Sequence, residues 1–216
     1  MKKYIAILGL GILRLTISSC EKEPTYNYPD GHVGGSKITV YATIALKGDA
    51  TVLLVKGTAF TDPGVTALEG KTALTPVIKG TVDVNTAGVY PITYTATNSD
   101  GFSTAVTRTV IVYDTKADAA ANDLSGTYSE GDEQASVWTK LAPGVYSVTD
   151  PAGNGLALTL IAFNPTGNTI HVPVQLSDDG TPISTTNESY DPVAGSYTWG
   201  IVNLEYKPVA LTFVKQ

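Results

Sequence analysis

The chain has 216 residues, with 20 acidic and 14 basic side chains and a formal net charge of −6. An acidic surface repels phosphate backbones, so this composition disfavours a nucleic-acid partner. The 21 glycines, 12 prolines, 12 tyrosines and few charged residues indicate an all-β exported protein, and a single cysteine excludes an internal disulfide.

The first twenty residues have the pattern of a secretory signal peptide. Lys2 and Lys3 form a short basic region, and residues 4–17 are mostly apolar, with Arg14 as the one charged interruption. Small residues then stand directly before Cys20. The alternatives are a transmembrane helix, for which an apolar run of about 20 residues is needed, and a buried structural cysteine.

Residues 17–20, Ile-Ser-Ser-Cys, resemble the lipobox of bacterial lipoprotein signals. The resemblance implies that residues 1–19 are removed and that Cys20 becomes an acylated N-terminus, which binds the membrane through its acyl chains. Two or more acyl chains give a stable anchor where one would not. Removal of Lys2, Lys3 and Arg14 leaves 14 minus 3, or 11, basic residues against 20 acidic ones, a net charge of −9.

Residues 20–36 are polar and rich in Pro and Gly, which predicts a lipidated flexible tether. Glu21, Lys22 and Glu23 directly follow the cysteine and resemble the signal that sends Bacteroidetes lipoproteins to the outer face of the outer membrane. An ordinary charged linker is the alternative. We therefore expect an outer-membrane, lipid-anchored protein on the extracellular face.

Apolar residues alternate with polar ones through the predicted first domain, residues 37–114, which indicates half-buried strands. Residues 88–114 predict a β-hairpin, in which Asp100 and Gly101 supply the positive φ angles of a tight turn. The stretches "DPGV", "AGVYPITYTATNSDG" and "RTVIVYD" resemble bacterial immunoglobulin-like domains of the hyalin-repeat-like type found in Bacteroidetes surface proteins. The resemblance implies a two-sheet sandwich of about seven strands that acts as a spacer or docking module.

Small and acidic residues at 115–122 predict a linker, and a second β-rich domain follows at residues 123–216. Its short alternating segments are separated by Gly- and Pro-containing turns, which predicts an antiparallel β-sandwich or barrel. The stretches "SGTY", "IHVPVQ" and "ESYDPVAGSYTWGI" are similar to the C-terminal region of Bacteroidetes surface lipoproteins of unknown function. That resemblance implies an association with starch-utilisation-type uptake loci, where a lipoprotein holds a polymer beside an outer-membrane transporter.

Little in the sequence supports catalysis. The two histidines fall in the tether (His32) and on the polar face of a predicted strand (His171), and there is no nucleophile elbow, zinc motif or phosphate loop. Three carboxylate pairs are candidates for glycoside hydrolysis, although turn formation explains them better: Asp132/Glu133, Asp178/Asp179 and Glu188/Asp191. We predict no enzymatic activity.

No metal or cofactor is predicted. Asp62, Asp178 and Asp179 offer oxygens that calcium prefers, but each lies in a sequence that favours a turn, and no calcium-loop series occurs.

Aromatic residues of the second domain are the candidate ligand contacts. Trp138, Tyr190, Tyr197 and Trp199 could stack on the apolar faces of sugar rings, with neighbouring Asp and Asn side chains bonding to hydroxyls. The alternative is a core role, because Trp199 alternates with Tyr197 and Ile201 as on a buried strand face.

The sequence therefore predicts a non-enzymatic, lipid-anchored surface protein that binds glycan or assists nutrient capture beside a transporter complex. Two alternatives remain open: an adhesion or structural protein–protein interaction module, and a periplasmic inhibitor or scaffold.

Overall fold

The structure is a computed structural model that describes residues 27, 29–33, 36–131, 135–155, 158–177, 180–203 and 208–216. The chain divides after Val40 into two compact units. The predicted signal peptide and Cys20 lie outside the described residues, as do Asp132, Glu133, Asp178 and Asp179. Predictions about them stay predictions.

The first unit contains a short hairpin of β1 (His32–Val33) and β2 (Ser36–Lys37). His32 pairs with Lys37, and the Ile38 amide donates to the Gly31 carbonyl at 2.6 Å. The sequence had predicted only an irregular tether here, because two-residue strands are too short to show a period.

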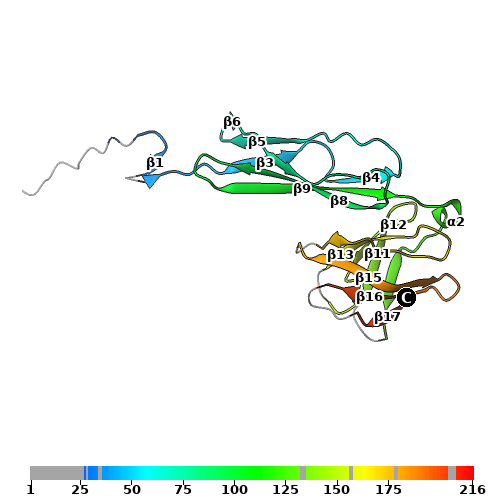
Figure 1. Cartoon of the computed structure of the whole chain (residues 1–216). Helices are drawn as coiled ribbons and strands as arrows, with labels where there is room; N and C mark the ends of the chain where they lie inside the picture. The colour runs from blue at the N-terminus through cyan, green and yellow to red at the C-terminus, as the bar shows by residue number, and fades with distance from the viewer. Residues whose placement is uncertain are drawn as a thin grey trace, which may run out of the picture. The chain divides into compact units, whose positions relative to one another are not determined.

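The second unit, residues 41–216, begins with two sheets that have the topology of an immunoglobulin-like sandwich (Figure 1). The first sheet has the order β3-β5-β6 and the second the order β4-β9-β8-β7. Their bounds are β3 (Ala42–Leu46), β4 (Thr51–Val55), β5 (Val65–Glu69), β6 (Thr72–Ala73), β7 (Val77–Lys79), β8 (Gly88–Thr97) and β9 (Ser103–Tyr113). The predicted immunoglobulin-like fold is confirmed.

The hairpin of β8 and β9 follows from strict alternation in its sequence. Ile92, Tyr94 and Ala96 are buried, while their neighbours along the strand face outward. The turn between the strands is held by the Asn98 side chain, whose Oδ1 accepts the Phe102 amide at 2.7 Å. Gly101 has a φ of 89°, as predicted, but Asp100 does not have a positive φ, so the prediction for Asp100 was wrong. One left-handed residue is enough here because the Asn98 side chain holds the turn through its hydrogen bond.

A single helical turn, α2 (Ala117–Ala120), lies in the predicted linker and is followed by an eight-stranded antiparallel sheet. The order of this sheet is β13-β12-β11-β10-β17-β16-β15-β14. Its bounds are β10 (Gly126–Ser129), β11 (Ser136–Ala142), β12 (Val145–Thr149), β13 (Thr159–Phe163), β14 (Gln175–Leu176), β15 (Pro182–Asp191), β16 (Ser196–Val202) and β17 (Ala210–Lys215).

The two outer strands of this sheet nearly meet, so the sheet resembles a closed barrel. Phe163 and His171 exchange backbone hydrogen bonds of 2.7 and 2.9 Å. Further along β13, the side chain of Gln175 takes the place of a strand: its Oε1 accepts the Ile161 amide at 2.7 Å and its Nε2 donates to the Ile161 carbonyl at 2.8 Å. Closure satisfies backbone groups that an open edge would leave unpaired. The prediction of an all-β chain with a second sandwich or barrel is confirmed, in its barrel form.

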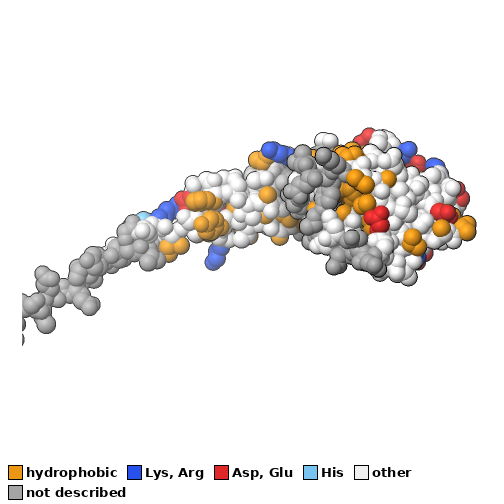
Figure 2. Space-filling view, turned by 90° about the horizontal axis from the view of Figure 1, so that it is seen from below, with side chains coloured by type: hydrophobic (Ala, Val, Ile, Leu, Met, Phe, Trp, Pro, Cys, Tyr) orange, Lys and Arg blue, Asp and Glu red, His pale blue; other side chains and the backbone are white. Residues whose placement is uncertain are grey.

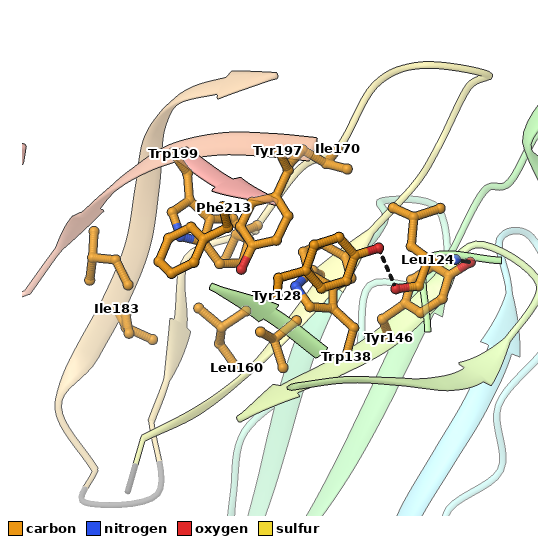
Figure 3. Packing of buried hydrophobic residues seen from close by; sticks show 14 residues of the cluster. Leu124, Tyr128, Trp138, Tyr146, Leu160, Ile170, Ile183, Tyr197, Trp199 and Phe213 are labelled. Carbon is orange, nitrogen blue, oxygen red and sulfur yellow. Dashed lines mark hydrogen bonds between the residues drawn. The ribbon is translucent and has the colours of Figure 1, made fainter. Parts of the chain in front are cut away.

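Aromatic side chains fill the barrel (Figure 3). The rings of Trp138 and Trp199 stack with centroids 5.5 Å apart, and those of Tyr197 and Phe213 stack at 5.0 Å. The Trp199 indole nitrogen donates to the Pro151 carbonyl at 2.9 Å. Such pairs contribute about 0.5–1.5 kcal/mol each beyond area burial, which helps a domain without disulfides to hold a single structure.

Among the described residues, no helix has the length and apolarity that a membrane span would need.

Candidate functional site

Three of the four predicted ligand-contact residues lie in the core. Trp138 is 2% exposed, Tyr197 1% and Trp199 0%. No ring face is open to a ligand, so we correct their assignment from ligand contact to barrel core. The cause is the alternation already visible in β16, which turns Tyr197, Trp199 and Ile201 inward.

Tyr190 differs from the other three. It lies on β15 directly opposite Tyr197 and is only partly buried, at the margin of the aromatic core. Burial, with a smaller contribution from Asp191, raises the pKa of its hydroxyl above the ordinary value. A ligand contact at Tyr190 stays a prediction.

A groove of about 590 Å³ lies within the second unit, and this volume falls in the range of small-ligand sites. One wall comes from the outward face of β4, β8 and β9, and the other from β11 to β14 and the segment that follows. The lining residues are Thr51, Val89, Pro91, Thr107, Thr109, Ile111, Leu141, Ser147, Thr159, Leu160, Ile161, Gln175, Leu176, Ser177 and Gly180.

The sandwich wall of the groove follows from the two-residue period of β9. Arg108 and Val110 are fully buried, so the residues that alternate with them, Thr107 and Thr109, face outward. Thr107 Oγ1 lies 3.1 Å from Thr93 Oγ1 on the neighbouring strand, and such cross-strand pairs order both side chains. The wall therefore presents hydroxyls in fixed positions.

The barrel wall combines apolar side chains with polar atoms. Ile111, Val145 and Phe163 form a small buried cluster beside the groove, and Ile161 packs against it. The Gln175 side-chain amide already forms hydrogen bonds with the backbone of Ile161, so the polar groups left to face the groove are mainly the hydroxyls of Ser and Thr.

Every lining residue that the structure describes is uncharged. Such a lining can donate and accept hydrogen bonds and can contact apolar C–H groups, but it contains no acid, base or thiol. The groove is therefore suited to a neutral, hydroxyl-bearing ligand and not to acid–base chemistry. Sequence reasoning missed it because its walls come from segments far apart in the chain.

His171 and Glu188 form a second polar feature, on the barrel. His171 Nδ1 lies 3.0 Å from Glu188 Oε2, and the Val172 amide donates to Glu188 Oε1 at 2.8 Å. Thr185 also donates its hydroxyl to Glu188. The bond to Glu188 raises the pKa of His171; burial would raise the pKa of Glu188, but its three hydrogen bonds outweigh burial and lower it.

The Glu188/Asp191 pair, considered above for glycoside hydrolysis, does not have the required character. A catalytic acid needs a raised pKa, and that of Glu188 is lowered. Asp191 Oδ1 accepts the Val193 and Ala194 amides at 2.9 and 3.0 Å and so caps the β15–β16 turn. The two carboxylates stabilise structure.

Asp62, the candidate calcium ligand, pairs with a buried arginine. Its Oδ1 accepts the Gly64 amide at 3.1 Å, the Tyr94 hydroxyl at 2.6 Å and Arg108 Nη1. Arg108 also donates to the Lys47 and Asp49 carbonyls. The sequence signal for this pair was an arginine at an inward position of an alternating strand. Within the described part of the chain, no group of three or more His, Cys, Asp or Glu is placed to hold a metal.

The described residues form a β-rich protein with a groove whose described lining contains no acid, base or thiol. Residues 44–112 match the family described as "Bacterial surface protein, Ig-like domain". This match agrees with the immunoglobulin-like sheets and fits a non-catalytic protein of the bacterial surface.

Comparison with solved structures gave several similar chains, among them the following two. The lipoprotein BT2262 from Bacteroides thetaiotaomicron is 28% identical, with 82% of this chain and 100% of that chain covered and a TM-score of 0.39. The catalytic domain and two CBM51 domains of ZmpB from Clostridium perfringens are 11% identical, with 83% of this chain and 21% of that chain covered and a TM-score of 0.31. None of the curated proteins matches this chain.

Proposed function

We propose that this protein is a lipid-anchored protein of the outer membrane, facing the exterior, that binds a neutral glycan in the groove between β9 and β13. Cys20 carries the acyl chains, and the bound polymer is held for a neighbouring transporter. The observation that carries the proposal is the lining of the groove, whose described residues combine hydroxyls with apolar side chains and carry no charge.

A glycan matches this lining in two ways. Its hydroxyls can exchange hydrogen bonds with Thr107, Thr109 and Ser147, and its C–H faces can contact Val89 and Ile161. An anionic polymer would find no basic side chain among the described lining residues and would be repelled by the acidic chain. The proposal therefore specifies a neutral polysaccharide.

The test is affinity electrophoresis of residues 21–216 through gels that contain neutral or anionic polysaccharides. The variant T107V/T109V removes two groove hydroxyls and keeps the β-branched shape that suits a strand. Loss of two hydrogen bonds of about 0.5–1.5 kcal/mol each weakens binding about tenfold or more. We expect retardation by a neutral polymer in the wild type and its loss in this variant.

T198V/T212V is the matched control. Thr198 and Thr212 also form a cross-strand hydroxyl pair, at 2.9 Å, with similar exposure, but they lie on β16 and β17 and do not line the groove. The control should migrate as the wild type does. Retardation that T107V/T109V retains would contradict the groove assignment, and the absence of retardation by every polymer would contradict glycan binding.

The edge strand β7 favours a second candidate function, protein–protein interaction. It is the outer strand of its sheet, and Val77 and Ile78 are both well exposed. An exposed apolar edge can pair with a strand of another protein. If this is the function, the protein should bind another protein, and polysaccharide in the gel should not slow its migration.

A further inference from the structure

Two large aromatic side chains are exposed side by side at one end of the immunoglobulin-like sandwich. Tyr41 is 62% exposed and Phe102 51%, and their ring centroids lie 5.5 Å apart at an angle of 59°. Tyr41 directly precedes β3, and Phe102 ends the β8–β9 turn. Aromatic rings are usually mostly buried, so an exposed pair indicates a contact surface.

The pair lies where the chain enters the second unit. Tyr41 is the first residue of that unit and follows Cys20 by 21 residues, since 41 minus 20 is 21. A chain segment of this length spans at most about 70 Å when fully extended. If Cys20 is lipidated, as the proposed function requires, lipid stays within reach of this end of the sandwich.

We infer that Tyr41 and Phe102 form a membrane-facing contact that inserts at the level of the lipid headgroups. Aromatic rings are favoured at that depth because they combine an apolar body with a polar edge or hydroxyl. Two rings bind lipid only weakly, but a tether raises the effective concentration of the surface, so weak contacts suffice. The inference rests on the lipid anchor of the proposed function and not on the glycan groove.

Charge at this end of the sandwich favours neither attraction nor strong repulsion. The Glu69 carboxylate accepts the Ser99 amide at 2.9 Å and the Ser99 hydroxyl at 2.6 Å, so it is engaged within the protein. Lys71 in the adjacent turn is basic and Asp100 in the β8–β9 turn is acidic, so these three side chains leave a single negative charge. The contact therefore depends on ring insertion and should change little with salt.

Sugar stacking is the competing use of exposed rings. A sugar offers one flat face, whereas the 59° angle between the rings of Tyr41 and Phe102 presents two different planes. On the sandwich part of the face drawn in Figure 2, hydrophobic side chains occur in small separate groups among polar atoms. A compact inserting group fits this geometry better than an extended stacking platform.

The test uses the full chain, processed and lipidated in a bacterial host and reconstituted in phosphatidylethanolamine–phosphatidylglycerol vesicles with or without brominated acyl chains. The variant F102W places an indole at the contact. Both native tryptophans are buried in the barrel and cannot meet lipid bromine. We expect F102W to show a blue shift and to lose emission in brominated vesicles, unchanged by salt, while the wild type loses little.

V193W is the control, because Val193 is almost fully exposed in the β15–β16 turn of the barrel. Its emission should not respond to brominated lipid. Adding Y41S to F102W should weaken the loss of emission, because the second ring no longer inserts.

Partition into the detergent phase of Triton X-114 reports the anchor separately. A chain that partitions there but whose F102W emission ignores brominated lipid overturns the membrane contact and leaves the anchor in place. A chain that stays in the aqueous phase overturns the anchor and this inference together, while the gel test of the groove still stands. An F102W response to soluble polysaccharide, and none to lipid, would also overturn the inference and assign the rings to glycan.

Discussion

The side chain of Gln175 should be one of the costliest polar groups to remove from the barrel. It is 6% exposed and makes three hydrogen bonds: from Nε2 to the Ile161 and Pro173 carbonyls at 2.8 and 3.2 Å, and to Oε1 from the Ile161 amide at 2.7 Å. Gln175→Leu deletes all three hydrogen bonds and replaces the amide with an apolar side chain of roughly similar size.

The magnitude follows from the groups left unpaired. A buried amide or carbonyl without a partner costs about 1–3 kcal/mol, and three backbone groups lose the partner that Gln175 provides: the amide and carbonyl of Ile161 and the carbonyl of Pro173. Ile161 is partly exposed, so water can reach its groups in part, and the lower end of the range applies. Leucine also gains some apolar burial. We expect the free energy of unfolding to fall by about 2 kcal/mol.

Urea unfolding followed by tryptophan fluorescence measures this change directly, because Trp138 and Trp199 both lie in the barrel core. Gln216→Leu is the matched control: Gln216 Nε2 donates to Ser129 Oγ at 2.6 Å and to the Val214 carbonyl at 3.2 Å, but the residue is exposed. Its removal should change stability by less than about 0.5 kcal/mol. Equal effects of the two substitutions would refute the role of Gln175 in closing the sheet.

Two further predictions concern ion pairs. Asp62→Asn leaves the fully buried Arg108 without its carboxylate, and because Asp62 is itself 25% exposed, we expect the free energy of unfolding to fall by about 2–3 kcal/mol, at or below the lower end for a broken buried pair. Thermal unfolding followed by circular dichroism should show a lower midpoint for this variant. Asp83→Asn, at an exposed residue, should leave the midpoint almost unchanged. The His171–Glu188 pair should stabilise the barrel most between pH 4.5 and 6.5, because the pKa of His171 is raised from 6.5 and that of Glu188 is lowered from 4.5. This contribution is lost as the pH rises through the folded pKa of His171, so between pH 6 and pH 8 the urea midpoint of the wild type should fall relative to that of Glu188→Gln. If the urea midpoints of the two proteins changed in parallel with pH, the pairing would be contradicted.

The strands of the sandwich could be predicted from the sequence because their signal is local. Ile92, Tyr94 and Ala96 repeat every second residue and are all buried, and the turn after them contains Gly101 at its left-handed position. A strand between a core and solvent must alternate in this way, so the pattern determines both the element and its inner face.

The same alternation misled the assignment of ligand contacts. Tyr197 and Trp199 have the spacing of an inward strand face, but spacing cannot say whether the interior of a barrel is open to a ligand or filled with side chains. That outcome depends on how Trp138 and Phe213, from two other strands, pack against them. Long-range packing of this kind leaves no trace in a single strand.

Residues that join distant segments were the hardest to predict. Arg108 binds Asp62, 46 residues away, and Gln175 binds Ile161 with a side chain that acts as backbone. Each looks like an ordinary polar residue in its own segment. The groove shares this property, since Thr109 and Ser147 line the same groove only after both sheets have formed.

The filled barrel limits where any ligand can bind. A ligand inside it would have to displace stacked rings, and removing one large aromatic from a core typically costs about 3–5 kcal/mol. That cost would consume much of the free energy of a millimolar to micromolar glycan complex, which is about 4–8 kcal/mol. Binding on the outer faces of the sheets avoids it, because the hydroxyl pairs of Thr93 and Thr107 are already ordered and partly solvated. The aromatic core thus favours recognition at the groove, where binding need not open the fold.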